Sequence, residues 1–169
     1  MPVLATGRYL RLRQDNGWEW CERVNSTGVV VVVAVTAAGD LLLVEQHRPP
    51  VGGRVLELPA GLAGDLADAR DEAFALAAAR ELEEETGYRA DRIEHLTAGP
   101  VSAGMTSEVL TWFRAHGLAR VGAGGGDASE DIVVHEVPLD GVEAFLDERI
   151  AAGTQVDPKV FAGLYFARR

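Results

Sequence analysis

The sequence predicts an α+β fold, a mixed β-sheet with helices on its faces. Residues 29–35 are almost continuous valine, which is typical of a central strand buried on both sides. Residues 71–86 contain neither glycine nor proline and are rich in alanine, leucine, glutamate and arginine, which predicts a helix. Segments with strand character outnumber those with helix composition. At 169 residues, the chain has the length of one domain and is large enough to bury a core.

The expected strands are separated by turn-forming residues. In chain order they are residues 7–13, 17–24, 29–35, 41–45, 55–58, 93–98, 108–115 and 131–137. Asp15-Asn16-Gly17 predicts a hairpin turn between the first two strands. A second turn, at residues 37–40, predicts that residues 41–45 return as the hairpin partner of residues 29–35.

Three helices are expected. The first ends at Gly87, because glycine readily adopts the left-handed conformation that stops a helix. The second covers residues 142–152. The third begins at Asp157-Pro158, where proline suits the first helical position, and ends near Arg169. The glycine-rich residues 121–130 form a loop that we expect to be mobile.

The chain is acidic, with a formal net charge of −10 and a pI of about 4.8. This charge argues against nucleic acid as a partner over a broad surface, although metal ions could screen the acids from a small phosphate substrate. The single cysteine, Cys21, excludes an internal disulfide and a cysteine-rich zinc site. We find no signal peptide and no apolar run long enough to cross a bilayer, so we expect a cytoplasmic protein without membrane contact.

The last turn and a half of the first helix is occupied by glutamates: Glu81, Glu83, Glu84 and Glu85. Acids are disfavoured at the negative C-terminal end of a helix, and like charges four residues apart repel by roughly 0.2–0.5 kcal/mol per pair. At about 100° per residue, three of them share one arc and Glu83 points away. The three are Glu81, Glu84 and Glu85. Carboxylates gathered on one face suit Mg²⁺ or Mn²⁺. The alternative is a solvated acidic face in which Arg80 pairs with Glu84.

The end of this helix reads Arg80-Glu81-Leu82-Glu83-Glu84-Glu85-Thr86-Gly87-Tyr88, with Glu72 upstream. It resembles the signature of the Nudix hydrolases, G-x5-E-x7-R-E-U-x-E-E-x-G-U, in which U is an apolar residue. The second half matches at every fixed position. In the first half, ten residues separate Gly61 from Glu72 where the family has five, so we interpret residues 62–70 as a lengthened loop.

Further segments resemble the ADP-ribose pyrophosphatase branch of that family. They are Trp18-Glu19, residues 45–50, residues 56–61 and residues 156–161. The branch implies an α/β/α sandwich. It also implies a homodimer in which an N-terminal β arm, residues 1–27, crosses from the Nudix domain of its own subunit, residues 28–169, to the partner.

The resemblance assigns metal binding to the first helix and to the turn before it. The implied ligands are Glu81, Glu84, Glu85 and the carbonyl of Ala60. Glu85 is also expected to be essential for catalysis. Arg80 would orient one of these carboxylates, or it would serve only as a structural ion pair.

Three residues are candidates for contact with the substrate. Arg48 matches a position that contacts ADP-ribose, and its guanidinium suits phosphate. Trp18 and Glu19 match positions that stack on the adenine and read it. For all three, a place at the dimer interface or on the surface is the alternative interpretation.

The resemblance to this branch also implies a catalytic carboxylate in the loop before the last strand, and Glu130 fits that position best. Some relatives carry a second acid two residues earlier, where this chain has Ala128, and Asp127 lies one residue further back. If that acid is the general base in those relatives, Glu130 or a metal-activated water replaces it here. Glu108 is a weaker candidate, because it also reads as an exposed strand residue.

The resemblance thus implies a metal-dependent hydrolase that converts ADP-ribose and water into AMP and ribose 5-phosphate. Metal ions would neutralise the diphosphate and activate the water, since carboxylates alone would repel the substrate. A GDP-sugar, another ADP-sugar or an oxidised nucleotide is an alternative substrate. A non-catalytic module that senses ADP-ribose would be expected to have lost the metal carboxylates. A plain acidic structural domain would leave their position at the helix end unexplained.

Overall fold

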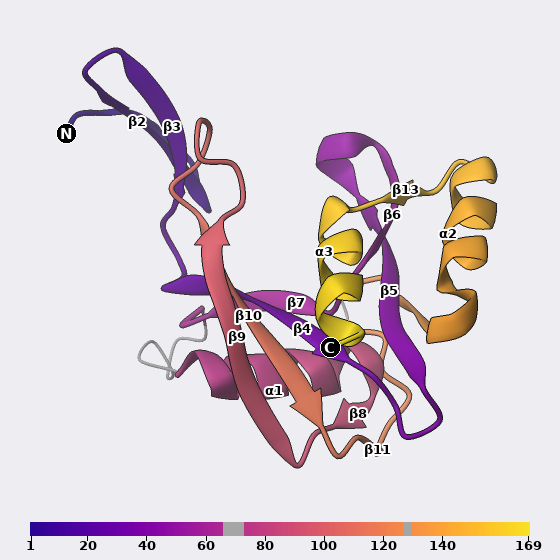
Figure 1. The fold of residues 1–169 in the computed structure, drawn as a ribbon. Helices are drawn as coiled ribbons and strands as arrows, with labels where there is room; N and C mark the ends of the chain where they lie inside the picture. The colour runs from indigo at the N-terminus through magenta and orange to yellow at the C-terminus, as the bar shows by residue number, and fades with distance from the viewer. Residues whose placement is uncertain (66–72, 127–129) are drawn as a thin grey trace.

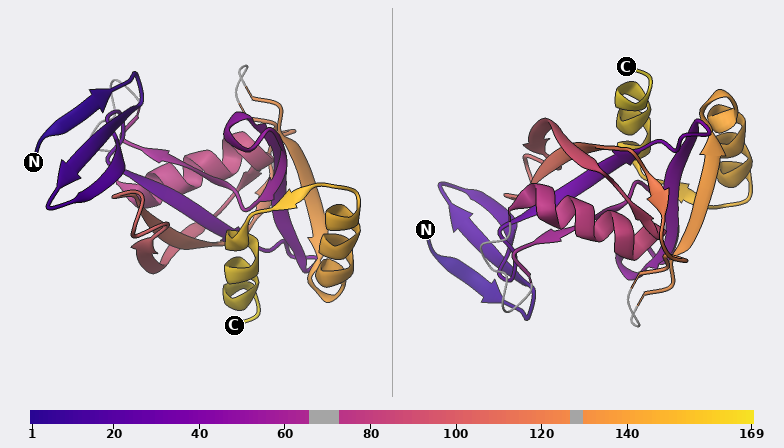
Figure 2. Two further views of the ribbon diagram at one scale, coloured as in Figure 1. Left: turned by 90° about the horizontal axis from the view of Figure 1, so that it is seen from above. Right: turned by 90° about the horizontal axis from the view of Figure 1, so that it is seen from below.

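The computed structural model describes residues 1–65, 73–126 and 130–169, and it confirms the α+β fold (Figure 1). The described strands form two four-stranded mixed sheets, a three-stranded antiparallel sheet at the N-terminus and a two-stranded ribbon. Figure 2 shows the N-terminal strands at one end of the molecule and helix α2 (Val142–Ala151) at the other. None of the described helices has the length and apolar character needed to cross a membrane.

The first mixed sheet has the strand order β7-β4-β10-β9. Its strands are β4 (Gly28–Ala34), β7 (Ala60–Ala63), β9 (Arg92–Pro100) and β10 (Val109–His116). β4 lies between β10 and β7, so it is a central strand, as its valines predict. Its even-numbered valines pack towards helix α1 (Phe74–Thr86), and its odd-numbered valines pack in a core shared with α2 and α3 (Pro158–Ala167). Helices therefore cover both sides, as in the predicted α/β/α sandwich.

The second mixed sheet has the order β12-β5-β6-β13. Its strands are β5 (Asp40–Arg48), β6 (Gly53–Glu57), β12 (Val133–Pro138) and β13 (Gln155–Val156). The expected hairpin between residues 29–35 and 41–45 is wrong, because β5 pairs with β6 and β12. In the described chain a single bridge, between Val35 and Leu41, joins β5 to the end of β4. After this bridge the chain enters the second sheet, where β5 pairs along one edge with β12 and along the other with β6.

The N-terminal arm is a sheet of β1 (Val3–Thr6), β2 (Leu10–Asp15) and β3 (Trp18–Arg23). The predicted turn is present at Asn16-Gly17, with φ of 47° and 83°. Cys21 joins the arm to the segment between β9 and β10, because its N–H donates to the carbonyl of Met105 and its carbonyl accepts from the N–H of Ser107. Strand β3 of the arm is therefore hydrogen-bonded to the segment between β9 and β10 of the same chain.

Helix α1 ends as predicted at Gly87, whose φ of 74° is left-handed. The next residues form a ribbon of β8 (Tyr88–Arg89) and β11 (Ala119–Arg120). Helices α2 and α3 end within two residues of their predicted ends, at Ala151 and Ala167. Pro158 occupies the first turn of α3, as expected.

The connection between β7 and α1 differs from the expected loop. Leu62 and Ala63 belong to β7, where they pair with β4, so the loop begins later than residue 62. The rest of that loop from residue 66, the expected helix start at residue 71 and Glu72 lie outside the described residues.

Residues 121–126 are held against the end of α1, whereas we expected a mobile loop. Gly125 donates its N–H to the carbonyl of Glu85 over 2.9 Å, and Gly126 donates to the carbonyl of Glu84 over 3.0 Å. These contacts satisfy carbonyls that the end of a helix otherwise leaves without a partner. Residues 121–126 are thus attached to the helix that carries the predicted metal ligands.

Candidate active site

A cleft of about 600 Å³, the size of a small-molecule site, lies beside α1 and β7. Among the described residues, seven acids and four bases line it. The acids are Glu57, Asp65, Glu81, Glu84, Glu85, Glu108 and Glu130, and the bases are Arg23, Arg48, Arg80 and Lys159. The cleft therefore combines residues from the arm, both mixed sheets, α1 and α3. Its excess of carboxylates favours a bound cation.

The three glutamates predicted to share one face of α1 all line this cleft. Glu83 points elsewhere, and its Oε1 lies 2.7 Å from Nη2 of Arg89. Glu85 is the most deeply placed, at 3% exposed, whereas the side chain of Glu84 is 54% exposed. The geometry is the one that helical periodicity predicts, with Glu85 at the floor and Glu84 at the rim.

Arg80 lies among these carboxylates. Its Nη1 donates to Oε1 of Glu81 over 2.9 Å and to Oε2 of Glu84 over 3.1 Å. Its Nη2 donates to the carbonyl oxygen of Leu62 over 2.9 Å. The pairing of Arg80 with Glu84 that we gave as an alternative is therefore present, together with a contact that orients Glu81.

The donor set fits a hard divalent cation, but the oxygens are not already gathered around one point. Within the described residues, no three acidic, histidine or cysteine side chains are close enough together to hold a metal ion. Instead, the guanidinium of Arg80 donates hydrogen bonds to oxygens of both Glu81 and Glu84. A cation in the cleft would replace Arg80 at one or both of these carboxylates.

The carboxylates of the floor are crowded and poorly solvated. Burial raises the pKa of Glu81 to about 7, although the charge and hydrogen bond of Arg80 oppose the shift. Burial likewise raises the pKa of Glu85 well above its usual value. The N–H of Ala60, 3.0 Å from Oε2 of Glu85, opposes that shift, and the charges of Glu81 and Glu130 add to it. A proton or a cation relieves this repulsion.

These shifts predict that the metal-free protein becomes less stable as the pH rises. Glu81 has a pKa of about 7 in the folded chain against 4.5 for an ordinary glutamate, so between these pH values the folded state binds more protons. The free energy of unfolding therefore falls with pH across this window, by at most about 3 kcal/mol for Glu81 alone. Calorimetry in EDTA between pH 4.5 and 8 measures the slope.

Two controls accompany this measurement. Mg²⁺ is expected to restore stability most strongly near pH 8, because the cation then meets ionised carboxylates. Glu81→Gln, which has no proton to lose, is expected to show a shallower slope than the wild type. Equal slopes for the two proteins in EDTA would contradict the assignment of the slope to Glu81.

Glu130 follows the glycine-rich segment and lines the same cleft. A Cβ added to Gly126 would lie 2.2 Å from Oε2 of Glu130, so this carboxylate packs directly on the glycine. The negative charge of Glu130 contributes to the raised pKa of Glu85, so the two carboxylates are close enough to repel each other. The alternative positions Asp127 and Ala128 lie outside the described residues.

The cleft also holds charged residues that the sequence analysis did not single out, namely Arg23, Glu57, Asp65 and Lys159. Nε of Arg48 donates to Oε2 of Glu57 over 2.6 Å, and Nε of Arg23 donates to Oε1 of Glu108 over 2.5 Å. Lys159 lies in the first turn of α3 and pairs with Asp157, the N-cap of that helix. A cation in the first turn opposes the helix dipole, and this was the signal that could have revealed Lys159.

Trp18 and Glu19 do not line the acidic cleft. They line a second cavity of about 510 Å³, together with residues from the segment between β9 and β10. Trp18 is 65% exposed. Within one chain, the structure does not bring the residues predicted to bind adenine together with the predicted metal ligands.

Comparisons with known proteins identify the family and the fold of the chain. The model of the NUDIX domain matches residues 26–152. The chain is 34% identical to the methanol dehydrogenase activator of Bacillus methanolicus over 153 residues, which are 86% of this chain and 80% of that protein. It is 38% identical to the ADP-ribose pyrophosphatase of Bacillus subtilis over 58% of this chain and 50% of that protein. It is 36% identical to the ADP-ribose pyrophosphatase of Mycobacterium tuberculosis over 71% of this chain and 59% of that protein.

A solved structure described as an ADP compounds hydrolase has the same fold. It superposes with a TM-score of 0.71 over 99% of this chain and 89% of that one, at 19% sequence identity. Because the match covers 99% of this chain, it includes the arm, both mixed sheets and the described helices as well as α1.

Proposed function

The chain belongs to the Nudix hydrolase family, and we propose that it hydrolyses the pyrophosphate bond of ADP-ribose, giving AMP and ribose 5-phosphate. One observation carries the proposal: three carboxylates from one face of α1 meet Glu130 and the cations Arg48 and Lys159 in a cleft of about 600 Å³. Carboxylates supply a place for cations, and cationic side chains supply contacts for phosphate.

Glu81, Glu84, Glu85 and the carbonyl of Ala60 would hold Mg²⁺, or Mn²⁺ in its place. When bound, such an ion neutralises phosphate oxygens and acidifies a water molecule. Both effects are needed here, because the cleft is otherwise too negative to accept a diphosphate.

The chain's own residues orient the substrate and move the proton. Arg48 and Lys159 line the cleft and are our candidates for contacts with the diphosphate. Glu130 accepts the proton as the water oxygen bonds to phosphorus, and the P–O bond to the leaving phosphate breaks. Arg80, displaced from the metal-binding oxygens, keeps its contact with the carbonyl of Leu62 and remains beside the site.

We further propose a homodimer in which the arm of each subunit completes the partner's site. The arm exposes large apolar side chains, which are Met1, Val3, Leu4, Tyr9, Leu10, Trp18 and Val24. Exposed apolar residues in such a group are typical of an interface. Transfer of Trp18 and Glu19 to the partner would supply the adenine contacts that the acidic cleft lacks within one chain.

The proposal is tested by product analysis with ADP-ribose, a second ADP-sugar, GDP-mannose and an oxidised nucleotide, each with Mg²⁺ and with EDTA. We expect equimolar AMP and ribose 5-phosphate from ADP-ribose, the highest kcat/KM on the panel, and no turnover in EDTA. A higher kcat/KM for GDP-mannose would show that a GDP-sugar, and not ADP-ribose, is the preferred substrate. Turnover in EDTA would refute the role given to the metal.

Trp18→Ala is expected to raise the KM for ADP-ribose by about 5- to 150-fold and to change kcat little, because base stacking is worth about 1–3 kcal/mol. Steady-state kinetics measure both constants. Tyr165→Ala removes an aromatic of similar exposure from α3 and is expected to leave KM unchanged. Size-exclusion chromatography shows whether either variant changes the oligomer. An unchanged KM in Trp18→Ala would remove this side chain from the adenine site.

A further inference from the structure

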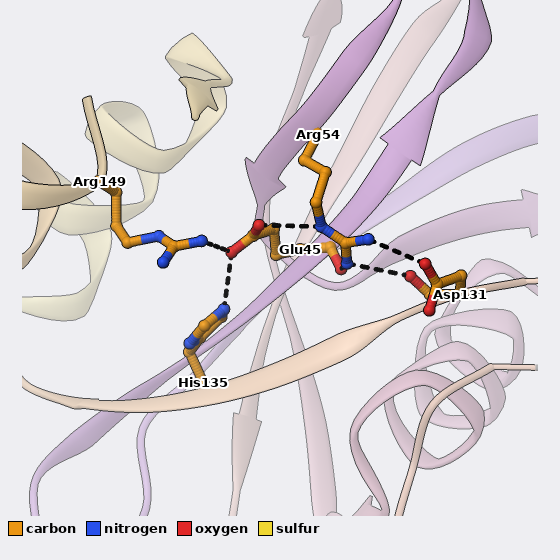
Figure 3. Close-up of polar contacts among 5 residues, drawn as sticks. All are labelled: Glu45, Arg54, Asp131, His135 and Arg149. Carbon is orange, nitrogen blue, oxygen red and sulfur yellow. Dashed lines mark hydrogen bonds and ion pairs between the residues drawn. The ribbon is translucent and has the colours of Figure 1, made fainter. Parts of the chain in front are cut away.

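A buried carboxylate, Glu45 on β5, is the centre of a cluster of charged residues (Figure 3). Glu45 is 3% exposed. Its Oε1 accepts from Nε of Arg54 over 3.0 Å, and its Oε2 lies 3.0 Å from Nε2 of His135 and is also paired with Arg149. Burial alone would raise the pKa of Glu45, but these hydrogen bonds and the charge of Arg149 hold it below its usual value. The buried charge is therefore satisfied from β6, β12 and α2.

Arg54 differs from the other two partners, because it also reaches the segment that carries Glu130. Its Nη1 donates to Oδ2 of Asp131 over 2.8 Å, and its Nη2 donates to the carbonyl of Asp131 over 3.3 Å and to the carbonyl of Glu45 over 2.9 Å. A guanidinium can make all these contacts at once because its nitrogens form a rigid fork. Arg54 thus ties both the backbone and the side chain of Asp131 to a buried strand.

Glu130 is the neighbour of Asp131 and is held from the other side as well. Its carboxylate packs on Gly126, whose N–H is bonded to the end of α1. Glu130 is therefore linked to α1 through Gly126 and to the cluster around Glu45 through Asp131 and Arg54. We propose that Arg54 is a positioning residue for the reaction, which acts by holding Asp131 and thereby placing the Glu130 carboxylate in the cleft. The inference rests on the proposed role of Glu130 in proton transfer.

A purely structural role accounts poorly for these contacts. The side chain of Asp131 is 80% exposed, and an ion pair so exposed contributes little to global stability. Glu45 would keep His135 and Arg149 if Arg54 were lost. Arg54 instead fixes the position of Asp131 and of its neighbour Glu130. A catalytic group displaced by about 1 Å can lower the rate about 100-fold.

The test compares two variants that each remove one arginine from Glu45. Arg54→Met removes the link to Asp131, and we expect kcat to fall by about 10- to 100-fold with KM within about twofold. Arg149→Met removes the matched charge on the α2 side without touching Asp131, and we expect a lower Tm but kcat within about threefold. Arg54→Lys keeps the charge without the fork and is expected to restore part of kcat. Equal kcat in the two methionine variants would overturn the proposal.

A double-mutant cycle with Glu130→Gln identifies the route of the effect. If Arg54 acts through Glu130, Arg54→Met causes no further loss of kcat in the Glu130→Gln background. An additional loss of the same size as in the wild type would show that Arg54 acts elsewhere, and the positioning role would be abandoned. If another sugar diphosphate proves to be the better substrate, the same cycle is measured with it.

Amide hydrogen exchange of the segment from Glu130 to Val133 tests the anchoring without any substrate. Arg54→Met is expected to speed exchange there at least tenfold, whereas Arg149→Met is expected to leave it near the wild-type rate. If the wild type fails to hydrolyse ADP-ribose but this difference is found, the proposed substrate is wrong and the anchoring stands. If exchange is the same in all three proteins, the anchoring is wrong whatever the substrate.

Discussion

Replacing Glu85 with glutamine is expected to lower kcat roughly a thousandfold, which corresponds to about 4 kcal/mol of lost transition-state stabilisation. Glu85 lies at the floor of the cleft, 3% exposed, with the N–H of Ala60 on one of its oxygens. Glutamine keeps the shape and can accept the same hydrogen bond, but it has no charge with which to hold a divalent cation. The loss should therefore appear in turnover and in metal affinity.

The stability of Glu85→Gln is expected to move in the opposite direction. Burial raises the pKa of Glu85, so its ionised form is unfavourable in the folded, metal-free chain. At pH 8 in EDTA, the variant should be at least as stable as the wild type. Calorimetry together with AMP-release kinetics separates a functional loss from a folding defect.

Glu83→Gln is the matched control, because it makes the same change on the same helix. Glu83 points away from the cleft and pairs with Arg89, so its loss is expected to change kcat by less than about twofold. Similar losses in the two variants would show that a general effect of helix charge, and not the position of Glu85, controls activity.

Gly61→Ala is expected to lower kcat/KM at least about 100-fold. A Cβ at this position would lie 2.0 Å from the carboxyl carbon of Glu81 and 2.2 Å from one of its oxygens, a distance that no pair of unbonded atoms tolerates. Glu81 would have to leave its place beside Glu84 and Glu85. The one methyl group therefore acts on the metal-binding face without changing any charge.

The control for this variant is Gly99→Ala. Gly99 lies in β9, and a Cβ there would meet nothing within 4 Å, so activity is expected to stay near the wild-type value. Calorimetric titration with Mn²⁺ is the second measurement, in which Gly61→Ala should bind more weakly than Gly99→Ala. Unchanged Mn²⁺ affinity in Gly61→Ala would contradict the place of Glu81 among the metal ligands.

The sequence predicts those parts of the fold that depend on local periodicity. The valines of β4 indicate a central strand and Gly87 indicates the end of α1, because burial on two faces and a left-handed stop leave clear local patterns. The strand partner predicted for β5 was wrong, since a pattern of alternating apolar and polar residues identifies a strand but not the strand it pairs with. Short elements such as β8 and β13 exist only through their pairing and have no pattern of their own.

The same distinction applies to the site. The carboxylates of α1 share a face because they are three and four residues apart, so the sequence alone can group them. Glu57 and Lys159 reach the cleft from β6 and α3, and the contact of Arg54 with Asp131 spans 77 residues. Such contacts depend on tertiary packing, which no local pattern records.

We expect the acidic face of α1 to hold divalent cations that bind the pyrophosphate of the substrate. Crystals grown with Mn²⁺ and a non-hydrolysable ADP-ribose analogue test it most directly, through the anomalous signal of manganese. We expect at least one manganese ion at about 2.1–2.2 Å from oxygens of Glu81, Glu84 or Glu85 and in contact with the diphosphate of the analogue. Analogue bound elsewhere, with only water beside these three side chains, would contradict the account.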